Sequence, residues 1–281
     1  MLRQRVITAL LMLAILLPAV FYPDPAAFYA VALILIAAGA WEWGRLNQYG
    51  QSSSIAVAAL CAVACLLAWY GGLLLRPMKE LWLLSGSGWV LLSAWLLSGG
   101  VKAWSSVPQA LRLTGGICAL FVAWMAVAQA RTIGINFLFS VLVLVWVADV
   151  FAYFFGRAFG GRLFNRKLAP SISPGKTWEG AFGGMFGVVG CALVWRVMDS
   201  TVPLAVPSLY SRLSEVHWGF MVLAVLFLAS MSIVGDLVES LFKRSAGVKD
   251  SSGLLPGHGG VLDRVDALLP ILPLAMMFTS L

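Results

Sequence analysis

Charged residues are scarce in this chain: Asp, Glu, Lys and Arg together make up 11% of its 281 residues. Soluble domains typically carry about 25% charged residues. A fold of this size also has too little interior to bury a sequence that is 61% hydrophobic. The low charge therefore excludes an ordinary soluble domain. Much of the apolar surface must face lipid, which predicts a polytopic integral membrane protein.

Cysteine and histidine are also rare, with four and two residues respectively. The cysteines all fall inside apolar segments and form no Cys-x-x-Cys pair, so neither a disulfide framework nor a zinc site is indicated. The sequence also lacks internal repeats and low-complexity linkers. It is therefore expected to form one membrane-embedded domain over residues 1–281.

Long apolar segments are what the sequence has in abundance. A membrane-spanning helix needs about 20 predominantly apolar residues. Nine segments come near that length: 6–22, 27–44, 54–75, 81–99, 113–130, 135–156, 178–198, 217–238 and 261–280. Glycines interrupt the fourth and fifth segments, which are nevertheless predicted as spans. The predicted fold class is all-α, with about nine transmembrane helices.

The basic residues are distributed unevenly between the loops. With a cytoplasmic N-terminus and nine spans, 14 of the 19 Lys and Arg residues fall on the cytoplasmic side. This is the positive-inside pattern. It predicts that the N-terminus and the loops after the sixth and eighth segments are cytoplasmic. The net charge of +7 then follows from topology, and no nucleic-acid partner is expected.

Acidic residues occur within several apolar segments, where charge is costly. Asp149 lies within the sixth segment, and a charge there costs at least about 2.5–3.5 kcal/mol, so such residues usually face a cavity or a partner. Tyr153 lies four residues later on the same helical face. An interhelical ion pair is the simpler alternative for Asp149. Glu42, beside two tryptophans near the end of the second segment, is expected at the membrane interface.

A Pro-Gly turn with the sequence SPGKTWEG precedes the seventh segment. Ser173, Lys176 and Thr177 lie in a predicted loop directly before a predicted helix start. Unpaired N–H groups at a helix start attract anions, and a lysine adds a full positive charge. This pattern indicates a phosphate contact, although an ordinary capped helix start would carry the same residues.

The end of the eighth segment and the loop after it hold the densest charge in the chain. Asp236 and Lys243 lie on one helical face with Ser240 nearby, and Gly235 would allow another helix to approach closely. In the next segment Asp263 and Asp266 again share a face. If the two segments form a hairpin, Asp236 and Asp263 can meet. Converging carboxylates within a basic surround favour Mg²⁺ with a phosphate substrate.

Residues 240–266 resemble the signature of a known protein family. Ser240-Leu-Phe-Lys-Arg244, Lys249-Asp250, His258-Gly259-Gly260 and Asp263-Arg264-Val-Asp266 together resemble the phosphatidate cytidylyltransferases, also called CDP-diacylglycerol synthases. The stretches around Asp149 and Ser173–Gly180 are similar to further blocks of that family. Residues 1–130 match only as hydrophobic spans.

The resemblance implies an integral membrane enzyme that converts CTP and phosphatidic acid into CDP-diacylglycerol and pyrophosphate. It implies Mg²⁺, with a second metal ion or K⁺ as a further candidate, a homodimer, and a bacterial cytoplasmic (inner) membrane with the site facing the cytoplasm. Residues 1–130 would be variable N-terminal helices, and residues 131–281 catalytic helices and cytoplasmic loops.

The expected site residues fall into three groups. The expected catalytic residues are Asp263, Asp236, Lys176, Lys249, Asp250 and His258. The expected substrate and phosphate contacts are Ser173, Lys176, Thr177, Ser240, Lys243, Arg244, Lys249, His258, Gly259, Gly260 and Arg264. The expected metal ligands are Asp236 and Asp263, with Asp266 or Asp149 in support. His258 could contact phosphate, protonate a leaving group or cap the loop.

Three alternatives remain at this point. A CTP-dependent lipid kinase would need a dedicated base to deprotonate an alcohol. A CDP-alcohol phosphotransferase would carry a pattern beginning DGxxAR, which this sequence does not contain. A cation transporter would place its acids near the membrane midplane on broken helices, whereas these acids lie mostly beside basic cytoplasmic loops.

Overall fold

The computed structural model describes residues 2–202 and 204–280. Within them, eight helices are long and apolar enough to cross a membrane, which confirms the all-α polytopic class. These helices are α1 (Leu2–Phe21), α2 (Ala26–Leu46), α3 (Gln51–Tyr70), α4 (Lys79–Ser106), α5 (Gln109–Ile133), α6 (Ile135–Phe159), α7 (Trp178–Thr201) and α9 (Trp218–Ser245). The shorter elements are η1 (Leu73–Leu75), β1 (Lys167–Ala169), β2 (Ser173–Thr177), α8 (Leu209–Val216), α10 (Leu262–Val265) and α11 (Leu268–Phe278).

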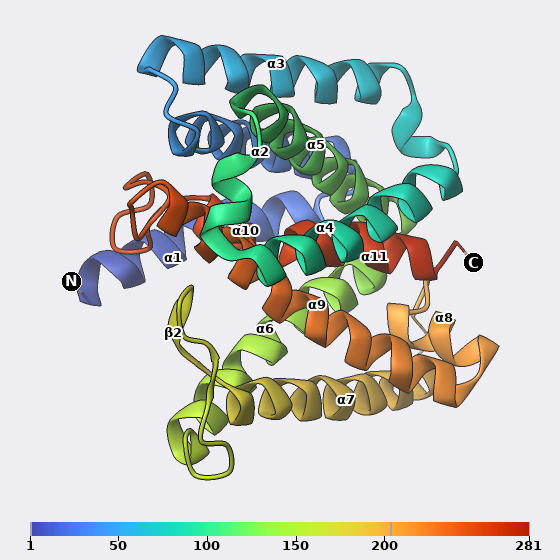
Figure 1. Ribbon diagram of the computed structural model, residues 1–281. Coiled ribbons are helices and arrows are strands. Elements are labelled where there is room, and N and C mark those ends of the chain that lie inside the picture. Colours follow the sequence, from blue (N-terminus) through green and yellow to red (C-terminus); the bar gives the residue numbers. More distant parts are fainter. Residues whose placement is uncertain (1, 203, 281) are drawn as a thin grey trace.

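The two ends of the helical bundle carry different segments of the chain. The N-terminus, β2 and the loop between α9 and α10 lie toward the left of Figure 1, whereas α8 and the C-terminus lie toward the right. Successive long helices therefore run in alternating directions. The N-terminus and the loops that are predicted to be cytoplasmic from their Lys and Arg content lie at one end of the molecule.

The glycine-interrupted fourth and fifth segments both form helices. α4 extends past the predicted segment and contains one break at Gly100, where φ is 62°. In α5, a Cβ added at Gly116 would lie 2.0 Å from the Trp43 ring of α2. Glycine at this position therefore makes room for a tryptophan.

Helices α6 and α7 pack closely because glycines line their contact. A Cβ at Gly180 would lie 2.8 Å from the carbonyl oxygen of Ala152, and one at Gly184 would lie 2.8 Å from that of Ala148. Small residues four apart let helix backbones approach closely in a membrane. The start of α7 is thereby held against the half of α6 that carries Asp149.

The ninth predicted span, 261–280, is corrected by the structure. It forms α10 and α11, of four and 11 residues, and neither reaches spanning length. The two helices are separated only by Asp266 and Ala267, because Pro270 has no N–H to donate to the carbonyl of Asp266. Leu262, in α10, donates to Glu42 near the end of α2. α11 then lies among α4, α5 and α9, and Phe278 contacts the Phe220 ring edge-on near the start of α9.

The predicted loop before α7 contains a small antiparallel hairpin. β1 pairs with β2 in a register that places Lys167 opposite Thr177 and Ala169 opposite Ser173. β2 leads directly into α7, and the Thr177 hydroxyl caps the helix by accepting a hydrogen bond from Gly180 N. Lys176 therefore lies on a strand one residue before the helix cap.

Candidate functional site

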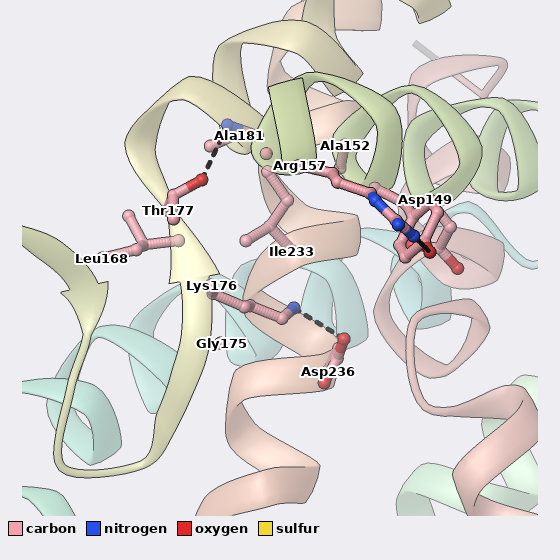
Figure 2. A pocket seen from close by; sticks show the side chains of 13 residues that line it. Asp149, Ala152, Arg157, Leu168, Gly175, Lys176, Thr177, Ala181, Ile233 and Asp236 are labelled. Carbon is pink, nitrogen blue, oxygen red and sulfur yellow. Dashed lines mark hydrogen bonds and ion pairs between the residues drawn. The ribbon is translucent and has the colours of Figure 1, made fainter. Parts of the chain in front are cut away.

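A cavity of about 610 Å³ lies between α6, β2, α7 and α9. Its charged and hydroxyl-bearing side chains are Asp149, Tyr153, Arg157, Lys176, Thr177 and Asp236. Figure 2 shows Lys176 extending from β2 to Asp236 on α9, with Asp149 on the neighbouring α6. Three elements distant in sequence thus direct charged groups into one space.

Asp236 is the most accessible of the paired acids. Lys176 Nζ lies 2.6 Å from Asp236 Oδ2, and the two side chains are 23% and 33% exposed. The Ser240 hydroxyl donates a longer bond of 3.3 Å to Asp236 Oδ1. Because both partners remain partly open to the cavity, each can exchange its present contact for a ligand.

Asp149 faces the cavity, as its position on one face with Tyr153 predicts. It forms no ion pair within 4.0 Å among residues 2–202 and 204–280, so the simpler alternative of an interhelical ion pair is not what the structure shows. Arg157 lies four residues after Tyr153 on the same face of α6, and its guanidinium donates to the Tyr153 hydroxyl at 2.9 Å. This arginine was not among the expected site residues, although its spacing places it there.

Lys243 and Asp263 form a second, more buried charge cluster. Lys243 Nζ lies 2.5 Å from Asp263 Oδ1 and also pairs with Glu239, and the lysine and Asp263 side chains are only 13% and 4% exposed. Asp263 Oδ2 accepts bonds from Ser251 N at 2.9 Å, Ser251 Oγ at 2.8 Å and Gly260 N at 2.7 Å. Both oxygens of Asp263 are therefore occupied by protein donors.

Asp263 lies outside the helices of spanning length, and its surroundings shift its pKa. Burial raises the pKa of this carboxyl, but the Lys243 ammonium and the N–H groups of Gly260 and Ser251 lower it by more. The net result is a pKa below the usual value, because every neighbouring donor favours the ionised form. In this structure Asp263 anchors the loop between α9 and α10.

Asp236 and Asp263, which are predicted to meet across the hairpin, each pair with a different lysine in the structure: Asp236 with Lys176 and Asp263 with Lys243. The acid that shares the 610 Å³ cavity with Asp236 is Asp149. The close helix approach predicted at Gly235 is confirmed, because a Cβ there would lie 2.7 Å from the Asp266 carbonyl oxygen.

The donor set can be tested against a divalent cation. Within the part of the chain that the structure describes, no group of three His, Cys, Asp or Glu residues is placed to hold a metal ion. Mg²⁺ needs only one or two carboxylates when phosphate and water complete its shell. Asp149 and Asp236 line the same cavity and leave carboxylate oxygens facing it, so the residues fit such an ion.

The other predicted residues are not part of the 610 Å³ cavity lining. Arg244 Nε donates to the carbonyl oxygen of Ile172 in the β1–β2 turn at 3.4 Å. Lys249 and Asp250 are exposed in the loop, and Arg264 lines the apolar cavity described below. Ser173 begins β2.

His258 is not among the residues that line the 610 Å³ cavity. Its Nδ1 is buried without a hydrogen-bond partner within the described residues, while its backbone N–H donates to Leu255 O. Gly259, with φ 82°, supplies the left-handed turn that follows. His258 therefore helps to shape the loop, and its contact with a substrate stays a prediction.

Two buried acids take roles that the sequence analysis did not predict. Glu42 is fully buried and accepts hydrogen bonds from Val261 and Leu262, and its depth relative to the membrane interface stays a prediction. Glu179 is 3% exposed, and its Oε1 accepts bonds from the N–H groups of Gly161, Leu163 and Phe164. The available signals were the place of Glu42 within an apolar segment and the position of Glu179 in SPGKTWEG.

A second cavity, of about 400 Å³, opens beside the first and is mostly apolar. Its apolar walls come from α1, α2, α5, α6 and α11, including Leu16, Phe28, Ile36, Val127, Trp146 and Leu272. Its charged lining is confined to Asp149, Asp263, Arg264 and Asp266. Asp149 lines both cavities, so a polar space and an apolar space adjoin at one carboxylate.

Comparison with known proteins agrees with this arrangement. The sequence matches the model of the Cytidylyltransferase family over residues 3–281. A phosphatidate cytidylyltransferase from Pseudomonas aeruginosa is 39% identical over 97% of this chain and 95% of its own length. One from Haemophilus influenzae is 35% identical over 99% and 98%, and one from Staphylococcus aureus is 38% identical over 58% of each chain. The chain belongs to the cytidylyltransferase family.

Proposed function

We propose that this chain transfers the cytidylyl group of CTP to phosphatidic acid, giving CDP-diacylglycerol and pyrophosphate. The observation that carries the proposal is the meeting of the polar cavity and the apolar cavity at Asp149. One space suits nucleotide phosphates and the other suits acyl chains. The relatives named phosphatidate cytidylyltransferase support the same reaction.

The chemistry needs little proton transfer. The phosphate of phosphatidic acid is mostly ionised at neutral pH, because the second pKa of a phosphate monoester is about 6. One of its oxygens forms a bond to the α-phosphorus of CTP, and the bond from that phosphorus to the bridging oxygen of pyrophosphate breaks. No strong general base is required, which suits a cavity whose lining contains no histidine.

The greater difficulty is bringing two polyanions together. We assign Lys176 and Lys243 to the phosphates, because each ammonium already rests on a carboxylate in or beside the cavity. Arg157 can bind a phosphate at the rim of the same cavity. These cations would offset charge that builds up on the α-phosphate and on departing pyrophosphate.

We further propose Mg²⁺ as the cofactor, held by Asp236 and Asp149 with Asp266 close by. A second metal ion or K⁺ belongs to the same proposal. When bound, Mg²⁺ would screen the phosphate oxygens and polarise the α-phosphate. The predicted role of Asp263 as a ligand would require it to release at least one of its present donors.

The helical topology supports a site open to the cytoplasm, where CTP is found. We propose that the protein lies in the cytoplasmic membrane of a bacterium, as an integral protein with lipid entering from the side. A homodimer is proposed on the family resemblance alone. Light scattering of the detergent-solubilised protein would distinguish a dimer from a monomer.

The deciding experiment uses purified protein, phosphatidic acid, Mg²⁺ and CTP labelled at the α-phosphate. Label in the lipid together with free pyrophosphate is the expected result. Label that stays in CDP, with a γ-phosphate moved to lipid, would instead identify a kinase. Phosphatidic acid omitted from the same mixture is the control.

A further inference from the structure

The loop between α9 and α10 is fastened by an acid that lies more than 200 residues earlier. Glu42 of α2 is 0% exposed. Its Oε1 accepts bonds from Ser252 Oγ at 2.5 Å and Val261 N at 2.9 Å. Its Oε2 accepts bonds from Leu262 N at 2.8 Å and, more weakly, from Ser251 Oγ at 3.2 Å. All four donors belong to one segment, 251–262.

Among residues 2–202 and 204–280, these hydrogen bonds offset the Glu42 charge. The carboxylate takes part in no ion pair within 4.0 Å among residues 2–202 and 204–280. A buried carboxylate without a cation is tolerated only when hydrogen-bond donors surround it. The side chain and the segment 251–262 therefore stabilise each other, because neither leaves its polar groups unpaired.

Glu42 and Asp263 hold the segment from two sides. Ser251 Oγ lies 2.8 Å from Asp263 Oδ2 and 3.2 Å from Glu42 Oε2. A hydroxyl has only one hydrogen, so the shorter bond to Asp263 takes it preferentially. Glu42 is linked to Asp263 mainly through the backbone N–H groups of Val261 and Leu262, the two residues before it. Asp263 in turn pairs with Lys243, which we assign to substrate phosphate.

The contact between Glu42 and the segment 251–262 leaves no room for a side chain at Gly260. A Cβ there would lie 2.4 Å from Glu42 Oε1 and 2.1 Å from Ser251 Oγ. Neither atom can move away without losing its bonds. The second glycine of His-Gly-Gly is thus required by a carboxylate from the N-terminal part of the chain.

We propose that Glu42 is a positioning residue for cytidylyl transfer, holding the 251–262 segment so that Asp263 and Lys243 keep their places beside the cavity. Glu42 does not touch the substrate in this proposal. The inference rests on the proposed function, and Glu42 acts through Ser252 and the backbone N–H groups at 261–262.

The test compares Glu42→Gln with Glu42→Asp and with Glu80→Gln, an exposed acid at the opposite end of the molecule. An amide cannot accept at its nitrogen, so Glu42→Gln leaves donors of the segment unpaired. Loss of alignment of about 1 Å can lower a rate about 100-fold. We expect kcat to fall by about 10- to 100-fold, with the KM for phosphatidic acid unchanged and partial recovery in Glu42→Asp.

Hydrogen–deuterium exchange provides a readout that does not depend on turnover. Faster exchange confined to 251–262 in Glu42→Gln, with α6, α7 and α9 unchanged, is the expected pattern. Wild-type kcat and wild-type exchange in Glu42→Gln would overturn the proposal. Exchange that rises across the whole protein would also overturn it, because Glu42 would then support the fold in general.

Ser252→Ala keeps the inference testable if Glu42→Gln does not fold. It removes one donor to Glu42 and leaves α2 intact, so a smaller fall in kcat and a smaller rise in local exchange are expected. No change in either quantity would contradict the proposed role of Glu42 in holding the 251–262 segment. Should wild-type protein fail to transfer label from CTP to lipid, the proposed function fails, while the exchange result still decides whether Glu42 orders the segment.

Discussion

At the scale of single residues, the acids of this protein differ in what occupies their oxygens. Asp149 and Asp236 face the 610 Å³ cavity, and Asp236 is held only by one lysine and one long hydroxyl bond. Both oxygens of Glu42 and of Asp263, and Oε1 of Glu179, instead accept hydrogen bonds, chiefly from N–H and O–H groups of loops. The acids that face the cavity are suited to bind ligands. The acids whose oxygens already accept hydrogen bonds are suited to hold the surrounding loops in place.

Asp236→Asn tests the role of an acid that faces the cavity. The change removes the charge that pairs with Lys176 and that we assign to Mg²⁺, so we expect kcat to fall by about 100-fold or more with the protein still folded. Turnover at saturating CTP, phosphatidic acid and Mg²⁺ measures this. Ser240→Ala, which removes only the 3.3 Å bond to the same carboxylate, should cost much less. Near-normal turnover in Asp236→Asn would contradict the assignment.

Glu179→Ala tests the role of an acid that already accepts hydrogen bonds from a loop. Three backbone N–H groups at 161, 163 and 164 would lose their acceptor, and an unpaired buried donor costs about 1–3 kcal/mol. Some will find water, so we expect a loss of about 2 kcal/mol in stability and a lower thermal midpoint in detergent. Glu215→Ala, an exposed acid of α8, serves as the comparison. An unchanged midpoint would show that the α6–β1 loop does not depend on Glu179.

At the scale of elements, helical spacing was a good guide and loop contacts were not. The face shared by Asp149 and Tyr153, and the close approach at Gly235, follow from local periodicity that any helix must obey. The contact between Glu42 and Val261 joins residues 219 positions apart. Nothing in the local sequence around either residue encodes it. The break within 261–280 had a local signal that the apolar composition obscured, because Pro270 has no N–H to donate to the carbonyl of Asp266.

The α6–α7 contact provides a prediction with a matched control in the same helix. Gly184→Val would press a branched side chain against the Ala148 carbonyl. Overpacking of this kind costs about 1–3 kcal/mol, and it would also separate Asp149 from Lys176. We therefore expect lower stability together with lower turnover. A side chain at Gly190, where a Cβ would meet no atom within 4 Å, should leave both unchanged. Equal effects at the two glycines would refute the packing argument.

The loop between α9 and α10 should respond to acid through Asp263. Its pKa is lowered in the folded protein, so the stabilisation is complete above the ordinary carboxyl pKa of about 4. It is lost as pH falls through the lowered value, because protonation weakens the bonds from Lys243 and the loop. We expect wild type to exceed Asp263→Asn by about 2 kcal/mol at pH 6, with the gap closing toward pH 3. A gap that stays constant across this range would contradict the effect.

At the scale of the whole molecule, the N-terminal helices contribute directly to the site. Arg5 and Thr8 of α1 donate to the carbonyls of Gly257 and Pro256, and Glu42 of α2 fastens the following residues. Apolar walls from the same two helices also line the second cavity. The N-terminal segments, which the family model also covers, therefore hold the signature loop and enclose the apolar cavity.

The orientation of the bundle decides whether CTP can reach the polar cavity. Arg166, between α6 and β1, and Ser200, near the end of α7, are both exposed and lie at opposite ends of the bundle. In a cysteine-free background, Ser200→Cys should react with an impermeant maleimide on right-side-out vesicles, and Arg166→Cys only after the membrane is permeabilised. The excess of basic residues at the Arg166 end sets this direction. Reversed labelling would place the cavity on the side away from cytoplasmic CTP, and the proposed reaction could not then draw on that pool.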